Sequence, residues 1–265
     1  FQAEDGIRDR SPSRGLGDVY KRQGLNRPAK MNGYTPQMAR QLVDAFERLD
    51  EDDDLWCGVL FGHGDHFTAG LDLPKFRDAM KGGQRYKQTE RVDPMGLGRR
   101  CRKPIVTAVQ GVTFTLGIEL MLAGDIVVAA DDCRFSQLEP MRGIHAAGGA
   151  TMRFVDRGGW GNAMYHLLTS DEFDATEAYR IGLVQEVVPA GTQLERAIEI
   201  AEVICTNAPL AIQATKASSA RYIREGEEAC IEALGSTQAE LAATEDAAEG
   251  VAAFRERRPG SFIGR

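Results

Sequence analysis

The feature that most constrains this chain is a short helical segment that is apolar nearly all round and carries one acid. Residues 116–124 read LGIELMLAG and follow the β-branched run IVTAV at residues 105–109, which predicts a buried strand. A helix without a polar face packs inside a protein, so Glu119 is predicted to be a buried carboxylate. Because an unpaired buried charge is costly, this carboxyl group must find partners or stay protonated. A raised carboxyl pKa also suits acid-base catalysis near neutral pH.

A second acid, Glu139, follows twenty residues later, after strand-like segments at residues 126–130 and 133–135. The two acids form a candidate catalytic pair, although the residues alone leave a structural role open for each. Glu119 lies near a helix start, where acids often complement the helix dipole, but Leu116 occupies the position where a capping box needs Ser or Thr. Taken alone, Glu139 fits a solvated turn residue better than a catalytic acid.

Three motifs, taken together, resemble the enoyl-CoA hydratase/isomerase (crotonase) family. They are HFTAGLDL at residues 66–73, GVTFTLGIELMLAGDI at residues 111–126 and FSQLEP at residues 135–140. The motifs stand in the family's order and spacing, and the resemblance continues to the terminal AAFRERRPGSFIGR. It implies an α/β fold, built as a spiral of repeated ββα units with a C-terminal helical region, which agrees with the alternation of strand and helix patterns up to about residue 190.

The resemblance implies an enzyme, a lyase that adds water reversibly and syn across the C2–C3 double bond of a 2-enoyl-CoA thioester in fatty acid or related acyl-CoA metabolism. It assigns Glu119 and Glu139 as the catalytic pair and the backbone N–H groups of Ala69 and Leu116 as an oxyanion hole for the thioester oxygen. The substrate-binding or CoA-binding residues that it implies are Thr68, Gly70, Asp72 and Gly117.

One departure from the family pattern concerns the oxyanion hole. The family's G-G-G-x-E run reads TLGIE here, so Leu116 takes the place of the middle glycine. Its backbone N–H is retained, but its Cβ restricts φ and fills space that a glycine leaves open. We therefore expect an intact oxyanion hole with an altered pocket shape and substrate preference.

Two alternatives to hydration remain open. One is an enoyl-CoA isomerase, or another acyl-CoA lyase or hydrolase, on the same oxyanion scaffold. The other is a non-catalytic acyl-CoA-binding member of the family. The resemblance favours hydration because the isomerase branch typically manages with one carboxylate. A buried acid without a task would also cost stability.

Composition limits the partners and cofactors. The net charge of -7 argues against a nucleic-acid or anionic membrane surface, and no apolar run reaches the length of a membrane span. His63 and His66 form an HxxH without a third ligand at recognisable spacing, so we expect loop histidines and no metal site. No redox cofactor is implied, since coenzyme A enters as part of the substrate.

The cysteines and the resemblance give two further expectations. The five cysteines are scattered, odd in number and never form a C-x-x-C, which fits reduced thiols in the cytoplasm better than a disulfide framework. The resemblance implies assembly as a homotrimer or as a hexamer, a dimer of trimers.

The chain divides into three predicted parts. Residues 1–23 are polar and without periodicity, and we set them apart as a non-native, adapter-derived tail, with only the end of a first strand surviving near residues 24–26. Residues 24–192 are the expected spiral core, and residues 193–265 the expected C-terminal helical region. Residues 74–103 are charged and interrupted by glycines, and are expected to form a mobile, partly helical segment over the site.

Local signals place most of the other elements. Thr35 and Pro36 predict the start of an amphipathic helix, WCGVLF at residues 56–61 predicts a strand, and Asp174 predicts the N-cap of a helix. Periodicity also predicts helices near residues 150–156 and 162–168, a strand at residues 183–188, and C-terminal helices over residues 193–206, 210–224, 227–243 and 245–257.

Overall fold

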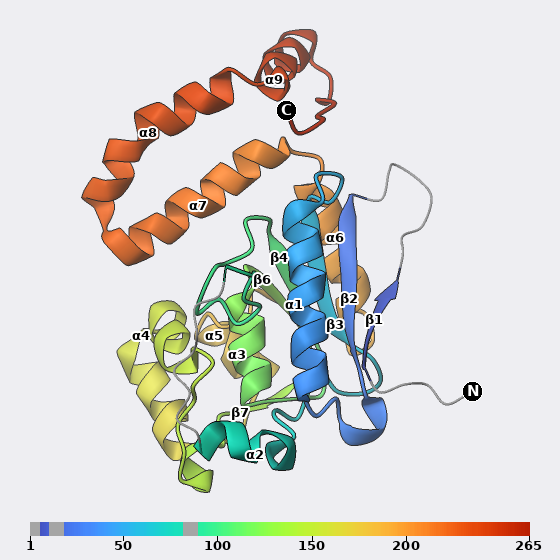
Figure 1. The fold of residues 1–265 in the computed structure, drawn as a ribbon, viewed down its shortest axis with the longest axis vertical. Coiled ribbons are helices and arrows are strands. Elements are labelled where there is room, and N and C mark those ends of the chain that lie inside the picture. The colour runs from blue at the N-terminus through green and yellow to red at the C-terminus, as the bar shows by residue number, and fades with distance from the viewer. Residues whose placement is uncertain (1–5, 11–18, 82–89) are drawn as a thin grey trace.

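The computed structural model, which describes residues 6–10, 19–81 and 90–265, contains two β-sheets side by side (Figure 1). The larger sheet has the order β1-β2-β3-β4-β6-β9, in which β1 pairs antiparallel with β2 and the other neighbours are parallel. The smaller sheet has the order β5-β7-β8. The strands are β1 (Gly6–Arg10), β2 (Tyr20–Asn26), β3 (Cys57–Gly62), β4 (Ile105–Val109), β5 (Val112–Phe114), β6 (Ile126–Ala130), β7 (Arg134–Ser136), β8 (Phe173–Asp174) and β9 (Glu186–Val188).

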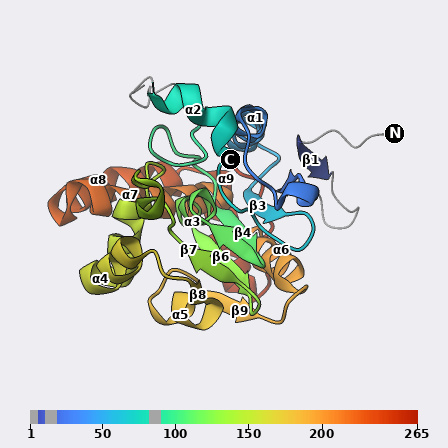
Figure 2. The same ribbon diagram turned by 90° about the horizontal axis from the view of Figure 1, so that it is seen from below.

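Helices cover both faces of the larger sheet, which explains why its central strands are continuous apolar runs. Helix α1 (Pro36–Glu51) lies over one face and α6 (Gln193–Ile204) over the other (Figures 1 and 2). All residues of β3 and β4 are buried, as expected for a parallel sheet covered on both sides. The predicted start of α1 is confirmed, since the Thr35 side chain accepts from the Met38 N–H.

The predicted ββα repeat is confirmed in two successive units. In β4-β5-α3 and in β6-β7-α4, one strand joins the larger sheet, the next joins the smaller sheet, and a helix follows. Helix α3 is Leu116–Ala123. The two helices expected near residues 150–168 are present as the two parts of α4 (Ala150–Thr169), which meet at a kink where the Gly159 backbone is non-helical.

The N-terminal part of the chain contributes more to the sheet than its sequence suggested. Strand β2 begins at Tyr20, so the boundary predicted at residue 23 falls inside a strand that pairs with both β1 and β3. Lys21 and Gln23 are buried, and Leu25 is fully buried. This corrects the expectation that only residues 24–26 of the first strand remain, because backbone pairing with β3 orders a segment that has no apolar period.

The C-terminal third is helical, as predicted. Helix α6 packs on the larger sheet, whereas α7 (Pro209–Glu225) and α8 (Glu227–Ala242) form an antiparallel pair that extends away from the core, followed by α9 (Glu245–Glu256) (Figure 1). In the described ranges, no helix combines the length and apolar character needed to cross a membrane. The remaining helices are α2 (Leu73–Lys81), α5 (Ala175–Arg180) and the short 3-10 turns η1 (Pro28–Lys30) and η2 (Pro140–Arg142).

Residues 74–103 were expected to form a mobile, partly helical segment, and the structure describes only part of this range. Helix α2 forms the start of this segment, and Asp93 organises a turn by accepting from the N–H groups of Met95, Leu97 and Gly98. Residues 82–89 lie outside the described part of the chain, so the mobility expected there remains a prediction.

Candidate active site

Glu119 lies in the first turn of α3, and only 4% of its surface is exposed. The chain enters this helix through Thr115, whose φ of 50° and ψ of -115° turn the backbone sharply. The Thr115 N–H donates to the Ser136 carbonyl at 2.9 Å, and its own carbonyl accepts from the Glu119 N–H at 3.1 Å. The prediction that Glu119 is carried on a buried apolar helix is therefore confirmed.

The start of α4 holds the Glu119 carboxylate. Its Oε1 accepts from the Gly148 N–H at 2.6 Å and from the Ala150 N–H at 3.3 Å. Burial raises the pKa of Glu119, while these two hydrogen bonds and the positive charge of Arg153 act in the opposite direction. The carboxylate is thus bound by donors that favour its ionised form, at the positive end of a helix dipole.

Glu139 follows β7 in the chain and occupies the N-cap position of η2. Only 7% of its surface is exposed. With its amide nitrogen facing this residue, Gln137 donates to both carboxylate oxygens, at 2.8 and 3.1 Å. Burial first, and the negative charge of Glu119 in addition, raise the pKa of Glu139 to about 7. Glu139 is a buried acid, and not the solvated turn residue that the sequence left possible.

The two carboxyl groups lie within electrostatic range of each other and have different surroundings. The charge of Glu119 acts on Glu139, and His145, in the loop between η2 and α4, acts on both. Glu119 accepts from the backbone at the start of α4 and feels the charge of Arg153, whereas Glu139 accepts from the Gln137 side chain and from its own backbone and has no arginine acting on it. Such a difference separates the protonation of paired acids, so that one acts as a base while the other holds a proton.

Two backbone amides in the predicted oxyanion-hole segments have no acceptor among the described residues. The Leu116 N–H opens α3, where no side chain caps the helix, and it has no acceptor within the described ranges. The Leu71 N–H likewise has no acceptor there, because the chain on either side of it pairs with Tyr34 through Gly70 and Asp72. Both amides are therefore free to donate to a ligand.

The expectation for Ala69 requires a correction. Its N–H donates to the Met31 carbonyl at 2.9 Å, so it is already used within the protein. The N–H groups of Gly70 and Asp72 are also bonded within the protein, so the amide of this loop that has no acceptor among the described residues is that of Leu71. The expectation for the Leu116 N–H is compatible with the structure, since this amide has no partner in the residues described.

The four residues expected to bind substrate mainly support the loop in this structure. Thr68 is fully buried, and its hydroxyl donates to the Asn32 carbonyl and accepts from the Gly70 N–H, so its expected role in binding remains a prediction. Asp72 forms an ion pair with Arg27 at 2.8 Å. The glycines permit close packing: a Cβ on Gly70 would lie 2.0 Å from the Thr115 Oγ1, and one on Gly117 would lie 2.9 Å from the Thr68 Cγ2.

Sequence reasoning missed four residues that shape the site: Gln137, Gly148, Ala150 and Leu71. Gln137 and Leu71 stand inside the quoted motifs, so their positions were visible but their hydrogen bonds were not. Gly148 belongs to a glycine pair before a predicted helix, a pattern that indicates free N–H groups at a helix start. Their roles depend on contacts between segments far apart in the chain.

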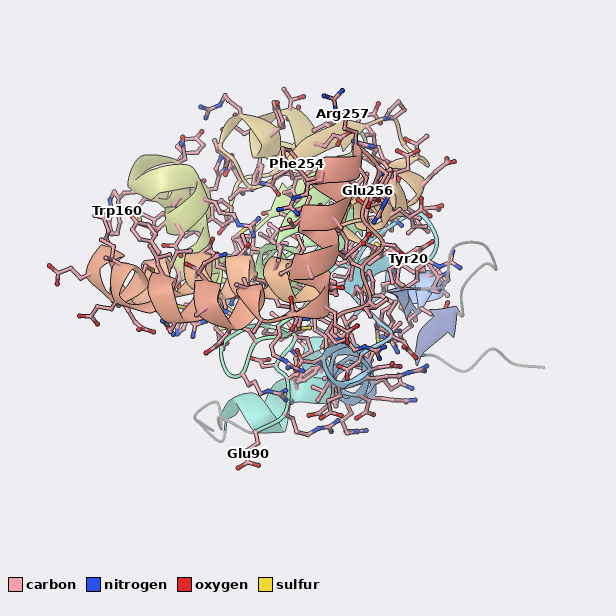
Figure 3. The ribbon with its side chains drawn as sticks, turned by 90° about the horizontal axis from the view of Figure 1, so that it is seen from above. Tyr20, Glu90, Trp160, Phe254, Glu256 and Arg257 are labelled. Atoms are coloured by element: carbon pink, nitrogen blue, oxygen red, sulfur yellow. The ribbon has the colours of Figure 1, made fainter. Side chains whose placement is uncertain are left out.

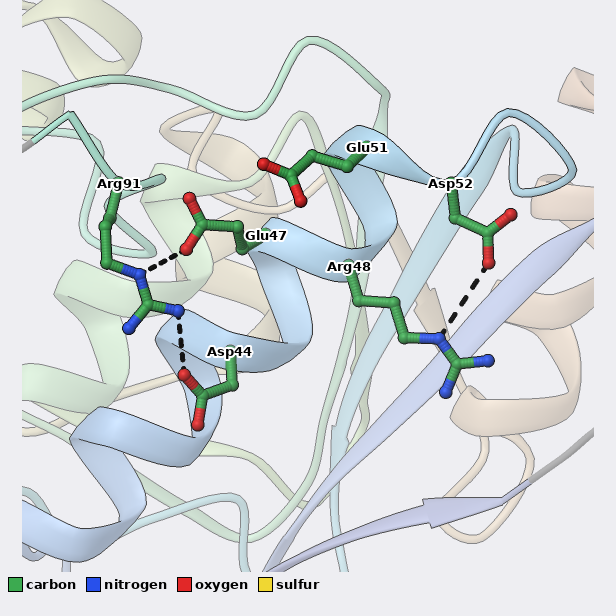
Figure 4. Close-up of a pocket in the computed structure, with 6 residues that line it drawn as sticks. All are labelled: Asp44, Glu47, Arg48, Glu51, Asp52 and Arg91. Carbon is green, nitrogen blue, oxygen red and sulfur yellow. Dashed lines mark hydrogen bonds and ion pairs between the residues drawn. The ribbon is translucent and has the colours of Figure 1, made fainter.

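A surface depression of about 510 Å³ on the outer side of α1 does not belong to this site (Figure 4). Most of its charged lining residues pair with one another: Arg91 with Glu47 and, at 2.7 Å, with Asp44, and Arg48 with Asp52 at 3.8 Å. None of the predicted site residues lines it.

The histidines of the HxxH motif contact other groups of the protein. The His66 Nδ1 accepts from the Val112 N–H at 3.2 Å, and the His63 ring packs edge-on against Phe61. Over the described ranges, no group of three or more His, Cys, Asp or Glu side chains is placed to hold a metal ion. The five cysteines are free thiols.

A family model described as enoyl-CoA hydratase/isomerase matches residues 23–265. Among curated proteins, the chain is 36% identical over 251 residues to an enoyl-CoA hydratase, EchA19, of Mycobacterium tuberculosis (strain ATCC 25618 / H37Rv), covering 91% of this chain and 92% of that one. It is 32% identical over 245 residues to 2,3-dehydroadipyl-CoA hydratase of Escherichia coli (strain K12), covering 91% and 94%.

Solved structures share the fold. A probable enoyl-CoA hydratase/isomerase from Mycobacterium abscessus superposes with a TM-score of 0.91 at 44% sequence identity, covering 98% of each chain. An enoyl-CoA hydratase from Mycobacterium tuberculosis H37Rv superposes with a TM-score of 0.87 at 32% identity, covering 99% of this chain and 100% of that one. The expected spiral α/β fold is therefore confirmed.

Proposed function

This chain belongs to the enoyl-CoA hydratase/isomerase family, and on that premise we propose that it adds water reversibly across the C2–C3 double bond of a 2-enoyl-CoA thioester. The observation that carries the proposal is the pair of buried carboxyl groups, Glu119 and Glu139, whose surroundings separate their protonation. Water addition needs one group to accept a proton and one to donate, and the pair supplies both.

The chemistry follows from the state of each acid. Glu119, held ionised by two amides, takes a proton from water as the water oxygen bonds to C3. The C2–C3 π electrons move toward the thioester carbonyl, and Glu139 gives its proton to C2. The proton gained by Glu119 then passes to Glu139, which restores the pair, and both new bonds form on the face of the substrate that the acids share.

Negative charge grows on the thioester oxygen during this step. We assign its stabilisation to the free N–H groups of Leu71 and Leu116, so that Leu71 replaces Ala69 in the pair expected from the sequence. Donors held in place before the reaction are typically worth about 3 kcal/mol each. With acids and amides supplied by the chain, the proposal includes no metal or redox cofactor, and coenzyme A is part of the substrate.

The test mixes the purified protein with crotonyl-CoA and follows the loss of the absorbance of the enoyl thioester. We expect Glu119→Gln and Glu139→Gln each to slow this loss by about 10² to 10⁴-fold with an unchanged circular dichroism spectrum. Glu240→Gln, an exposed residue on α8, is the matched control and should retain the full rate. Full activity in both site variants would overturn the proposal.

A second candidate, isomerisation or another acyl-CoA reaction on the same scaffold, shares the two free amides. It would show as turnover of a 3-enoyl-CoA with little hydration of crotonyl-CoA. The presence of two acids favours hydration, because a double-bond shift can be carried by one.

We further propose a homotrimer or a dimer of trimers. Exposed apolar side chains on α7, α8 and α9 support it, and 85% of the Phe254 surface is exposed (Figure 3). The others are Tyr222, Ile223, Ile231, Leu234 and Val251. Light scattering on the purified protein tests this, and a monomer at micromolar concentration would contradict it. The five free thiols support our proposal of a cytoplasmic location.

A further inference from the structure

Arg153, in the first turn of α4, is a buried cation without a carboxylate partner at ion-pair distance. Only 6% of its surface is exposed, and no Asp or Glu oxygen among the described residues lies within 4.0 Å of it. Its guanidinium donates instead to three backbone carbonyls: Gly148 at 3.1 Å, Glu119 at 3.5 Å, and Met95. Burying a charge without a counter-charge costs free energy, so the presence of Arg153 here indicates a functional role.

The contacts of Arg153 converge on the group that holds Glu119. The N–H of Gly148 donates to the Glu119 carboxylate, while the carbonyl of Gly148 accepts from Arg153. A Cβ on Gly149, whose φ is +110°, would lie 2.4 Å from the Arg153 Nη1, so a glycine leaves room for the guanidinium. One side chain thus links α3, the loop before α4 and the turn at Met95.

The charges around Arg153 come from four elements. Glu119 on α3 and Asp93 in the preceding turn attract it, whereas Arg100 and Arg157 repel it, with Asp156 and Asp125 acting on those two arginines. Asp93 is engaged with the backbone amides of its own turn. Around Glu119 the other charged groups are His145 and Glu139.

We infer that Arg153 is a positioning residue that keeps Glu119 in place and in its carboxylate form, so that Glu139 carries the proton. The inference rests on the proposed function, in which the two acids must differ. The guanidinium acts in two ways: it holds the backbone that supplies the Gly148 donor, and its positive charge favours the negative form of Glu119. Burial raises the pKa of both acids, and the charge of Arg153 acts against that rise at Glu119 and not at Glu139.

The test compares Arg153→Met and Arg153→Lys with the exposed control Arg40→Met by following crotonyl-CoA hydration from pH 5 to 9. In Arg153→Met we expect kcat to fall by roughly 10 to 100-fold with KM changed less than about threefold, because a displaced base loses rate more than binding. The acidic limb of kcat/KM should move up by about one pH unit, since losing a nearby positive charge favours protonated Glu119. Arg153→Lys should keep the limb in place at an intermediate kcat, and Arg40→Met should match the wild type.

If the acidic limb of Arg153→Met lies at the same pH as that of the wild type, the inference is overturned, whatever the value of kcat. If this variant does not fold, Arg153→Lys decides: a displaced acidic limb, or a rate equal to the wild type, would overturn it. An infrared titration of the Glu119 carboxylate band, identified by its absence in Glu119→Gln, measures the protonation of this acid without any turnover. A wild-type protein that hydrates no enoyl-CoA would refute the proposed function, while this titration would still test the effect of Arg153.

Discussion

The amide N–H of Gly148 donates to the Oε1 of Glu119 at 2.6 Å, across twenty-nine positions of the chain. This bond joins the start of α4 to the first turn of α3 and fixes the orientation of the carboxylate in the candidate active site. Two elements that do not follow each other directly are therefore both needed to place a single acid.

Gly148→Ala should lower kcat/KM on the order of 100-fold. The added Cβ would lie 2.4 Å from the Glu119 Oε2 and 2.6 Å from the Met95 Cε, so the acid must move, and a displacement of about 1 Å can cost this much. A Cβ at Gly161, in α4, would meet nothing within 4 Å, so the control Gly161→Ala should leave the rate unchanged. Steady-state kinetics of both variants checks this, and equal rates would contradict it.

Hydration should slow at alkaline pH because of Glu139. Burial first, and then the charge of Glu119, raise the pKa of this group to about 7, and only the protonated form can deliver a proton to C2. We therefore expect kcat/KM in the hydration direction to fall above pH 7, approaching tenfold per pH unit. A flat profile from pH 6 to 9 would show that another group supplies the proton.

The same group should make the folded state less stable as the pH rises. The folded protein binds the Glu139 proton with a pKa of about 7, above the ordinary 4.5, so the stabilisation present below pH 4.5 is lost as the pH rises through 7. Glu139→Gln removes this loss and should raise the free energy of unfolding at pH 8, relative to wild type, by roughly 1 to 3 kcal/mol more than at pH 5. Denaturant titrations at the two pH values, with Glu240→Gln as control, measure the difference; equal effects at both would count against a raised pKa.

Thr115→Gly should stabilise the protein by about 1 kcal/mol. A β-branched residue with φ of 50° and ψ of -115° is strained, at a cost of about 1 to 3 kcal/mol, partly offset by the greater freedom of glycine in the unfolded chain. Thr215→Gly, at an exposed position of α7, should instead destabilise by about 0.5 kcal/mol. Chemical denaturation distinguishes the two, and destabilisation by Thr115→Gly would mean that its side-chain packing outweighs the strain.

Asp50→Asn should destabilise the protein by about 3 kcal/mol. The Asp50 side chain is fully buried, and its carboxylate accepts from the Arg102 N–H at 2.6 Å and pairs with the guanidinium groups of Arg99 and Arg102. Removing one charge leaves the others without a counter-charge in a desolvated place. The exposed Asp54→Asn should change stability by less than about 0.5 kcal/mol, and thermal unfolding of the pair provides the check.

Local patterns predicted much of the fold correctly. The apolar runs of β4 and β6, the cap of α1 at Thr35 and the cap of α5 at Asp174 all lie where the sequence placed them. The strand predicted over residues 183–188 is shorter, and β9 is only Glu186–Val188. Strand β2 was underestimated because it depends on pairing with β3, which a local pattern does not record.

The sequence by itself determined that Glu119 lies on a buried helix, because a helix that is apolar all round has no face suited to solvent. It also identified Glu139 as the second acid. The tertiary structure alone decided which groups surround the pair. It occupied the Ala69 amide with the Met31 carbonyl, left the Leu71 and Leu116 amides free, and brought Gly148 and Arg153 to Glu119. The physical reason is that apolar periodicity is a local property, whereas a hydrogen bond or a desolvated charge depends on atoms that only the folded chain brings together.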